Sequence, residues 1–232
     1  LIFVGTDNAL YVSPDDGGQW LQLKNNLPPS PVYHLAIQKN FRDLAVATYG
    51  RGFYILADIT PIREWSKRLA ASKTSLYPLR PAYRFNMKGA NHDGGAAVRG
   101  ENRPYGASIN YFLADTWQTA PKVFVLGPLG DTIKTIKGSN LKGVNRVWWD
   151  LAHEELKMPS LKTKPKGKDF VKLDATGSRL MYVPDLDIGP GMEPIRVPIG
   201  SYQVLLKTDA GVEKQMLQVL QDPNAGSTKE AI

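Results

Sequence analysis

The stretch Ser13-Pro14-Asp15-Asp16-Gly17-Gly18-Gln19-Trp20 decides the fold of the first part of this chain. It lies between two short apolar runs, residues 9–12 and residues 21–23. Glycine accepts a positive φ, and aspartate hydrogen-bonds to the backbone that follows it, so this composition between two β-prone runs specifies a tight turn. The stretch therefore predicts a β-hairpin.

Short β-prone runs separated by Gly, Asn, Asp and Pro continue on both sides of this turn. They occupy residues 1–4, 9–12, 20–23, 32–37, 44–48 and 53–56. The connections are too short for crossover helices, so the strands should pair in antiparallel fashion. This part of the chain is predicted to be all-β.

An internal sequence repeat supports a β-propeller fold for this part of the chain. Residues 1–15 align without gaps on residues 44–58, an offset of 43 residues. This offset lies within the roughly 40 to 45 residues of one four-stranded propeller blade. Few residues are identical, but apolar and turn positions coincide.

The second copy of the repeat, residues 44–58 and the residues after it, does not keep the turn residues of the first copy. Leu56, Thr60 and Arg63 stand where the first copy has Ser13, Gly17 and Trp20. Thr60 followed by proline instead predicts an N-cap, with a short helix over residues 62–71. The propeller is therefore expected to end here.

The pattern Ser13-x-Asp15-x-Gly17-x-x-Trp20 resembles the Asp-box of BNR-repeat β-propellers, with Gln19 where that family usually has Thr. The resemblance implies that Ser13 and Asp15 tie the turn to its own backbone and that Trp20 packs between blades. Further stretches resemble bacterial VPS10/sortilin-like BNR proteins, at residues 32–37, 43–56, 58–61, 100–107 and 143–151. The chain is thus similar to the C-terminal part of such a protein, with about one and a half blades.

A second domain is expected after a connector. The strand candidates are residues 108–113, 122–126, 132–136, 145–151, 200–207 and 213–220. Short antiparallel strands of this spacing suggest a β-sandwich of immunoglobulin or fibronectin type. Side chains alternate along a strand, so one of Trp148 and Trp149 should enter the core.

The expected organisation has four parts. These are propeller blades with a short helix (1–71), a linker (72–105), a β-sandwich (106–223) with a long insert (154–198), and a tail (224–232). The chain begins at Leu1, inside an expected strand, so we expect a fragment of a longer protein.

The composition excludes several kinds of functional site. The 232 residues carry a net charge of +7 and no cysteine, which excludes disulfides, thiolate metal sites and cysteine nucleophiles. No apolar run approaches the roughly 20 residues of a membrane-spanning helix, so the chain is not expected to cross a membrane.

Much of the positive charge lies in one stretch of the expected insert, which includes Lys162, Lys164, Lys166 and Lys168. It is either a solvated loop or a contact for an anionic surface, such as a lipid surface or an acidic protein. Nucleic acid is not expected as a partner, because the run lacks interleaved aromatic residues.

No catalytic, cofactor or metal site is expected. The histidines are far apart in sequence and have no partners at ligand spacing. Arg51, between two glycines, and two tryptophans, Trp65 on the expected helix and Trp117 in a loop, are candidates for contact with a partner.

The function expected from these features is a non-catalytic protein-binding or scaffolding module. It would be an accessory subunit of a larger extracytoplasmic, membrane-associated complex, with a periplasmic, secreted or cell-envelope location implied by the resemblance. The alternative is the C-terminal fragment of a sialidase-like glycosyl hydrolase whose active site lay in missing blades. Carbohydrate binding, suggested by Trp117 and the Trp148-Trp149 pair, is a third interpretation.

Overall fold

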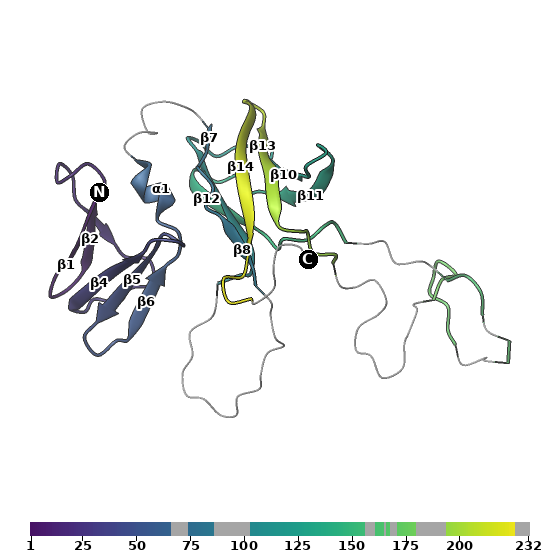
Figure 1. The fold of residues 1–232 in the computed structure, drawn as a ribbon, viewed down its shortest axis with the longest axis horizontal. Coiled ribbons are helices and arrows are strands. Elements are labelled where there is room, and N and C mark those ends of the chain that lie inside the picture. The colour runs from purple at the N-terminus through teal and green to yellow at the C-terminus, as the bar shows by residue number, and fades with distance from the viewer. Residues whose placement is uncertain are drawn as a thin grey trace. The chain divides into compact units, whose positions relative to one another are not determined.

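The computed structural model describes residues 1–65, 74–85, 103–155, 161–164, 166–167, 171–179 and 194–225 (Figure 1). The chain divides into two compact units, Leu1–Leu151 with Pro198–Ile232, and Ala152–Val197. The second unit spans nearly the residues of the expected insert. Within the described part of the chain, the strands form four sheets and α1 (Thr60–Arg63) is the one named helix. The predicted all-β class is confirmed.

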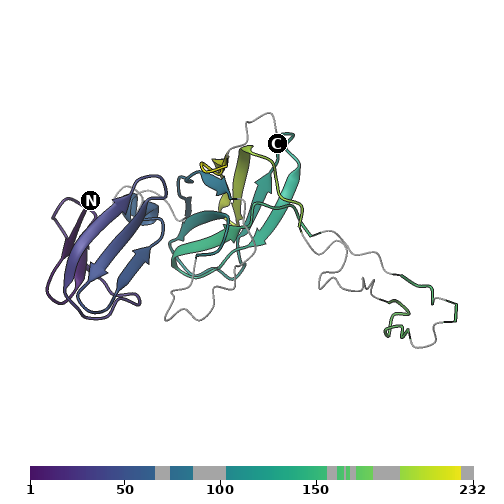
Figure 2. The same ribbon diagram turned by 60° about the horizontal axis from the view of Figure 1, so that its bottom comes forward.

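The first six strands form two antiparallel sheets of three. Their bounds are β1 (Ile2–Gly5), β2 (Leu10–Ser13), β3 (Leu21–Leu23), β4 (Val32–Gln38), β5 (Asp43–Thr48) and β6 (Phe53–Leu56). The sheet orders are β1-β2-β3 and β4-β5-β6. These strands form the purple and blue end of the ribbon in Figure 2. Val12 of β2 pairs with Leu21 of β3, so the predicted hairpin is confirmed.

One hydrophobic cluster joins these two sheets. Its buried members are Leu10, Val32, Leu44, Val46 and Ile59, with Phe3, Leu23, Leu35, Tyr54 and Leu56 packed against them. The Val32 amide also donates a 2.9 Å hydrogen bond to the carbonyl of Thr6. A side chain at Gly5 would meet Val32 at 2.6 Å, so β1 and β4 approach each other closely because Gly5 has no Cβ.

The helix begins differently from the prediction. Thr60 is the first helical residue of α1, and the N-cap position falls on Ile59, which makes no side-chain capping bond. Asp58, at φ 56°, instead accepts a 3.2 Å hydrogen bond from the Thr60 amide. The predicted N-cap role of Thr60 was therefore wrong, because a carboxylate two residues earlier takes that amide. Residues 66–71 of the expected helix lie outside the described residues.

The remaining strands form a five-stranded and a three-stranded sheet. They are β7 (Thr74–Leu76), β8 (Ala82–Arg84), β9 (Ala107–Leu113), β10 (Lys122–Leu126), β11 (Thr132–Lys137), β12 (Gly143–Trp149), β13 (Gly200–Thr208) and β14 (Gly211–Gln221). The sheet orders are β11-β10-β13-β14-β8 and β12-β9-β7. β7 and β8, which lie in the expected linker, are both edge strands, and β8 pairs with β14 in parallel.

The core of this part is built on Trp149. Its side chain is fully buried and meets the ring of Tyr202 edge-on, with centroids 5.4 Å apart. Trp148 points to the other face and is partly exposed, so the predicted alternation is confirmed. Gly106, at φ 116°, leaves no space for a side chain, because an ideal Cβ would lie 1.9 Å from the Trp149 carbonyl oxygen.

Candidate functional site

The predicted turn at residues 13–20 is tied to its own backbone. The Ser13 hydroxyl donates to Asp15 Oδ1 at 2.9 Å and accepts from the Gly17 amide at 2.7 Å. Asp15 Oδ1 also accepts from the Gln19 amide at 2.8 Å. These bonds, first that of the Gln19 amide and then that of Ser13, lower the pKa of Asp15 because they favour its ionised form.

Trp20 lies directly before β3, which is an edge strand of its sheet, and its side chain is 45% exposed. Its packing between blades stays a prediction. The turn is a structural element here and carries no reactive group.

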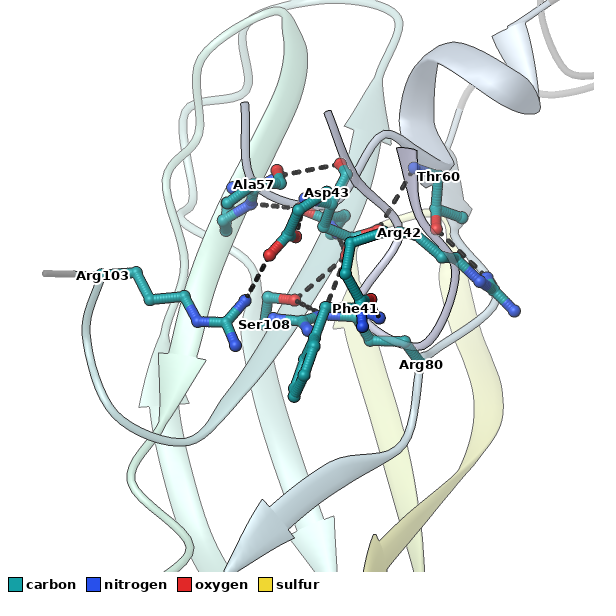
Figure 3. A network of polar contacts seen from close by, with 12 residues as sticks. Phe41, Arg42, Asp43, Ala57, Thr60, Arg80, Arg103 and Ser108 are labelled. Carbon is teal, nitrogen blue, oxygen red and sulfur yellow. Dashed lines mark hydrogen bonds and ion pairs between the residues drawn. The ribbon is translucent and has the colours of Figure 1, made fainter. Parts of the chain in front are cut away.

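A network of polar contacts surrounds the loop between β6 and α1, with Asp43, Ala57 and Thr60 drawn beside Arg80 and Ser108 (Figure 3). Asp58 lies in this loop. Asp58 is buried, and its Oδ2 accepts from Asn110 Nδ2 at 2.7 Å and from the Ser108 hydroxyl at 3.0 Å. Ser108 and Asn110 both lie on β9. The backbone amide of Asp58 donates to Asp43 Oδ1 at 2.9 Å. The loop after β6 is thus bonded to β9 and to the start of β5.

Arg146 holds the same loop from β12. Its Nη2 donates to the carbonyl oxygens of Ala57 at 2.8 Å and Asp58 at 3.2 Å. Its Nε donates to Asn110 Oδ1 at 2.6 Å, which places this guanidinium between β9 and the loop. Three directed donors from one planar group fix the position of the loop more tightly than a flexible ammonium could.

Two further arginines complete what we call the Asp58 network, which consists of Asp43, Asp58, Arg80, Arg103, Ser108, Asn110 and Arg146. Arg80 Nε donates to the Ser108 hydroxyl at 3.1 Å and lies 3.7 Å from Asp58 Oδ2. Arg103 pairs with Asp43 Oδ2 at 2.9 Å. Both guanidinium groups lie against the Phe41 ring, 5.6 Å (Arg80) and 4.7 Å (Arg103) from its centroid.

Burial lowers the pKa values of two arginines in the Asp58 network. Desolvation lowers the pKa of Arg80, and the neighbouring charge of Arg103 lowers it further, whereas Asp58 opposes both. Desolvation likewise lowers the pKa of Arg146, and Asp58 again opposes it. Arginine titrates so far above neutrality that these groups stay charged at pH 7. The network contains three arginines and two aspartates.

The sequence-predicted contact residues lie outside this network. Arg51 is exposed in the turn between β5 and β6, whereas Trp65 and Trp117 are partly buried. The Trp117 backbone exchanges hydrogen bonds with Asn140, at 2.9 Å and 2.6 Å, so this residue belongs to an ordered loop.

The lysines of the expected insert belong to the second unit. Lys162, Lys164 and Lys166 are exposed there, and Lys168 lies outside the described residues. Their exposure leaves both interpretations open, the solvated loop and the contact for an anionic surface.

Sequence reasoning missed Arg80, Arg103 and Arg146. A usable signal was present for Arg146, because a charged residue in the middle of a strand rich in valine and tryptophan needs a buried partner. That partner, the loop of Asp58, is almost ninety residues away and could not be identified from spacing.

The described residues contain no group of three His, Cys, Asp or Glu side chains placed to hold a metal ion. Among the described helices, none is long and apolar enough to cross a membrane. Comparison of the chain with protein-family models, curated proteins and solved structures finds no match.

Proposed function

We propose that this chain is a non-catalytic protein-binding and scaffolding module, formed by the end of a β-propeller and an immunoglobulin- or fibronectin-like β-sandwich. The observation that carries the proposal is a pair of exposed apolar side chains, Phe53 and Ile55, on the outer face of the β4-β5-β6 sheet. The proposal includes a partner of defined chemistry, a second β-sheet with an apolar face.

The two faces of the β4-β5-β6 sheet differ in what covers them. One face, with Leu44, Val46 and Tyr54, packs into the cluster shared with the first sheet. On the other, Phe53 and Ile55 of β6 lie opposite Ala47 and Ala45 of β5, because directly paired residues share a face. Phe53 is 84% exposed and Ile55 is 63% exposed. A face of this composition is typical of a surface that another sheet covers.

The outer face of the first sheet carries partly exposed apolar side chains as well. Ile2 and Val4 of β1 are 39% and 38% exposed, and Val4 pairs with Tyr11 of β2. The opposite face, with Phe3 and Leu10, packs into the shared cluster. Two packed sheets whose outer faces both carry exposed apolar side chains are consistent with two neighbouring blades of a larger propeller, in which each blade packs face to face against the next.

Strand counting supports the same arrangement. The offset of 43 residues aligns β1 with β5 and β2 with β6. β3 has no aligned partner after β6, where α1 follows. The β4-β5-β6 sheet therefore has three strands where a four-stranded blade would have one more. β6 is consequently a sheet edge whose backbone groups can pair with a strand from a partner.

The Asp58 network supports the scaffolding role. It bonds the loop after β6 to β9 and β12, so that the propeller end and the proposed sandwich act as one body. We place this body, as the family resemblance implies, in an accessory subunit of an extracytoplasmic, membrane-associated complex with a periplasmic, secreted or envelope location. Within the described residues, no cluster favours the glycosyl hydrolase alternative.

The test uses self-association of the 232-residue chain, because an uncovered apolar face associates with copies of itself when its partner is absent. We expect light scattering after size exclusion to show concentration-dependent association. The double variant Phe53→Ser with Ile55→Thr should be more monomeric at equal concentration.

Leu129→Ser is the matched control, since Leu129 is 95% exposed in the turn between β10 and β11. It should associate as the unmodified chain does. A chain that stays monomeric throughout, or a double variant that behaves like the control, would overturn the proposal.

A further inference from the structure

We propose that the cavity beside Phe41 binds a small monocarboxylate carried on an aromatic or similarly flat ring. This site is independent of the sheet faces in the proposed function. Its walls come from Phe41, Arg80, Tyr83, Phe85, Arg103 and Tyr105.

The size of the cavity fits a small molecule. Its volume is about 440 Å³, within the range of known small-molecule pockets. The residues that line it lie just before β5, around β8 and ahead of β9, so its wall is assembled from segments far apart in the sequence. Strands or their immediate flanks hold each of these segments.

One part of the wall is aromatic. The rings of Phe41 and Tyr83 have centroids 5.2 Å apart, and those of Tyr83 and Phe85 are stacked at 5.9 Å. Three rings at these separations form a surface against which a flat ring can stack. This part of the cavity recognises the body of the ligand.

The other part of the wall is cationic. Arg80 is only 4% exposed and lines the cavity, and within the described residues its contacts with Ser108 and Asp58 run through Nε rather than through its two terminal nitrogens. Arg103 uses Nη1 for Asp43 and has further donors. A guanidinium with two nitrogens on one edge matches the two oxygens of a carboxylate.

The numbers of arginines and aspartates in the Asp58 network favour a ligand with one negative charge. The Asp58 network contains three arginine side chains and two aspartate side chains. Both cavity arginines lie against the Phe41 ring (Figure 3), and their mutual repulsion contributes to the lowered pKa of Arg80. One bound negative charge neutralises the excess cation, whereas a dianion would overcompensate it.

Calorimetric titration of the 232-residue chain with benzoate tests the proposal. We expect saturable binding with a dissociation constant of roughly 1 mM, as suits a ligand of this size. Benzamide, which has the same ring without the charge, and inorganic phosphate, which has charge without a ring, should each bind about tenfold more weakly. N-acetyl-Ala-Phe, which carries its carboxylate at the end of a peptide chain, then distinguishes two sources of the carboxylate. If it binds more tightly than benzoate, the ligand is a chain terminus; if it binds more weakly, the ligand is a free small molecule.

Two variants locate the site. Arg103→Gln should weaken benzoate about tenfold, and Phe85→Leu should weaken it while leaving the charged donors in place. Arg51→Gln, an exposed arginine outside the cavity, should leave binding unchanged. If Arg103→Gln does not fold by circular dichroism, Phe85→Leu alone decides the outcome. Absence of saturation at about 20 mM benzoate, equal binding of benzamide or phosphate, or unchanged binding by Phe85→Leu would overturn the proposal.

Discussion

The side-chain amide of Asn110 donates a 2.7 Å hydrogen bond to the carboxylate of Asp58, which links the loop after β6 to the middle of β9. The two residues are 52 positions apart, and both are buried. Asp58 also carries a positive φ of 56°, which aspartate and asparagine tolerate better than most residues. The stability of this junction therefore depends on one residue for both charge and backbone conformation.

Asp58→Ala should destabilise the chain by about 3–5 kcal/mol, because it leaves the buried Arg80 without its carboxylate partner. Urea unfolding followed by circular dichroism measures this change. Asp58→Asn is the matched control, since it keeps the size and the tolerated φ, and its loss should be smaller. An alanine variant within about 0.5 kcal/mol of the unmodified chain would contradict this role, since ordinary surface substitutions have effects of that size.

Arg146→Lys should cost about 2 kcal/mol, because lysine cannot donate at once to Asn110 and to the carbonyl oxygens of Ala57 and Asp58. Hydrogen exchange should also become faster at the Asp58 and Thr60 amides, which lie in the loop that Arg146 holds. Arg51→Lys, at an exposed turn, is the control and should change neither property. Unchanged exchange in the Arg146 variant would show that the loop is held by other contacts.

Trp149→Ala should destabilise the chain by about 3–5 kcal/mol, because it removes a fully buried side chain and its edge-on contact with Tyr202. Trp148→Ala, on the opposite face of β12, should cost less than half as much, since this indole is partly exposed. Thermal and urea unfolding of both variants check the difference. Equal losses would mean that the two faces of β12 are equally packed.

Gly106→Ala should cost at least about 2 kcal/mol, because the new Cβ would overlap the Trp149 carbonyl oxygen and the residue also has a positive φ. Gly130→Ala separates the two causes. Gly130 has φ 83° and no atom within 4 Å of an added Cβ, so its variant should show only the backbone strain, about 1 kcal/mol. Similar unfolding free energies for the two variants would show that Gly106 has room to adjust.

The Asp15 carboxyl should titrate below its ordinary range, because the Gln19 amide and the Ser13 hydroxyl bond to its ionised form. A lowered pKa in the folded state means that these bonds stabilise the fold above the ordinary pKa, and that the effect is lost as the pH falls through the folded value. In an NMR pH titration, Ser13→Ala should raise the pKa of Asp15 toward its ordinary value.

Asp174 provides the internal control, since Thr176 and Ser178 lower its pKa in a turn of the second unit. Its titration should be the same in the Ser13 variant and in the unmodified chain. If Asp15 titrates identically with and without the Ser13 hydroxyl, the turn is held by the Gln19 amide alone.

The strands of both parts could be predicted because their signals are local. Alternating β-prone runs bounded by Gly, Asn, Asp and Pro placed β10 at residues 122–126 and most other strands within one or two residues of their observed ends. The hairpin between β2 and β3 also followed from local turn chemistry, since Ser13 and Asp15 bond only to neighbours in the chain. The start of α1 was misplaced because the group that accepts the Thr60 amide bond is the Asp58 carboxylate rather than a side chain at the N-cap position.

The amino-acid sequence by itself thus predicted the positions of most strands and the turn between β2 and β3, because each depends on residues close together in the chain. Tertiary structure alone decided that Asp58 meets Asn110 and Arg146, that Arg80 and Arg103 share the Phe41 ring, and that Phe53 and Ile55 remain uncovered. These relationships join residues far apart in the chain or depend on which face is covered. Their energies come from burial and directed hydrogen bonds, which exist only once the sheets have packed.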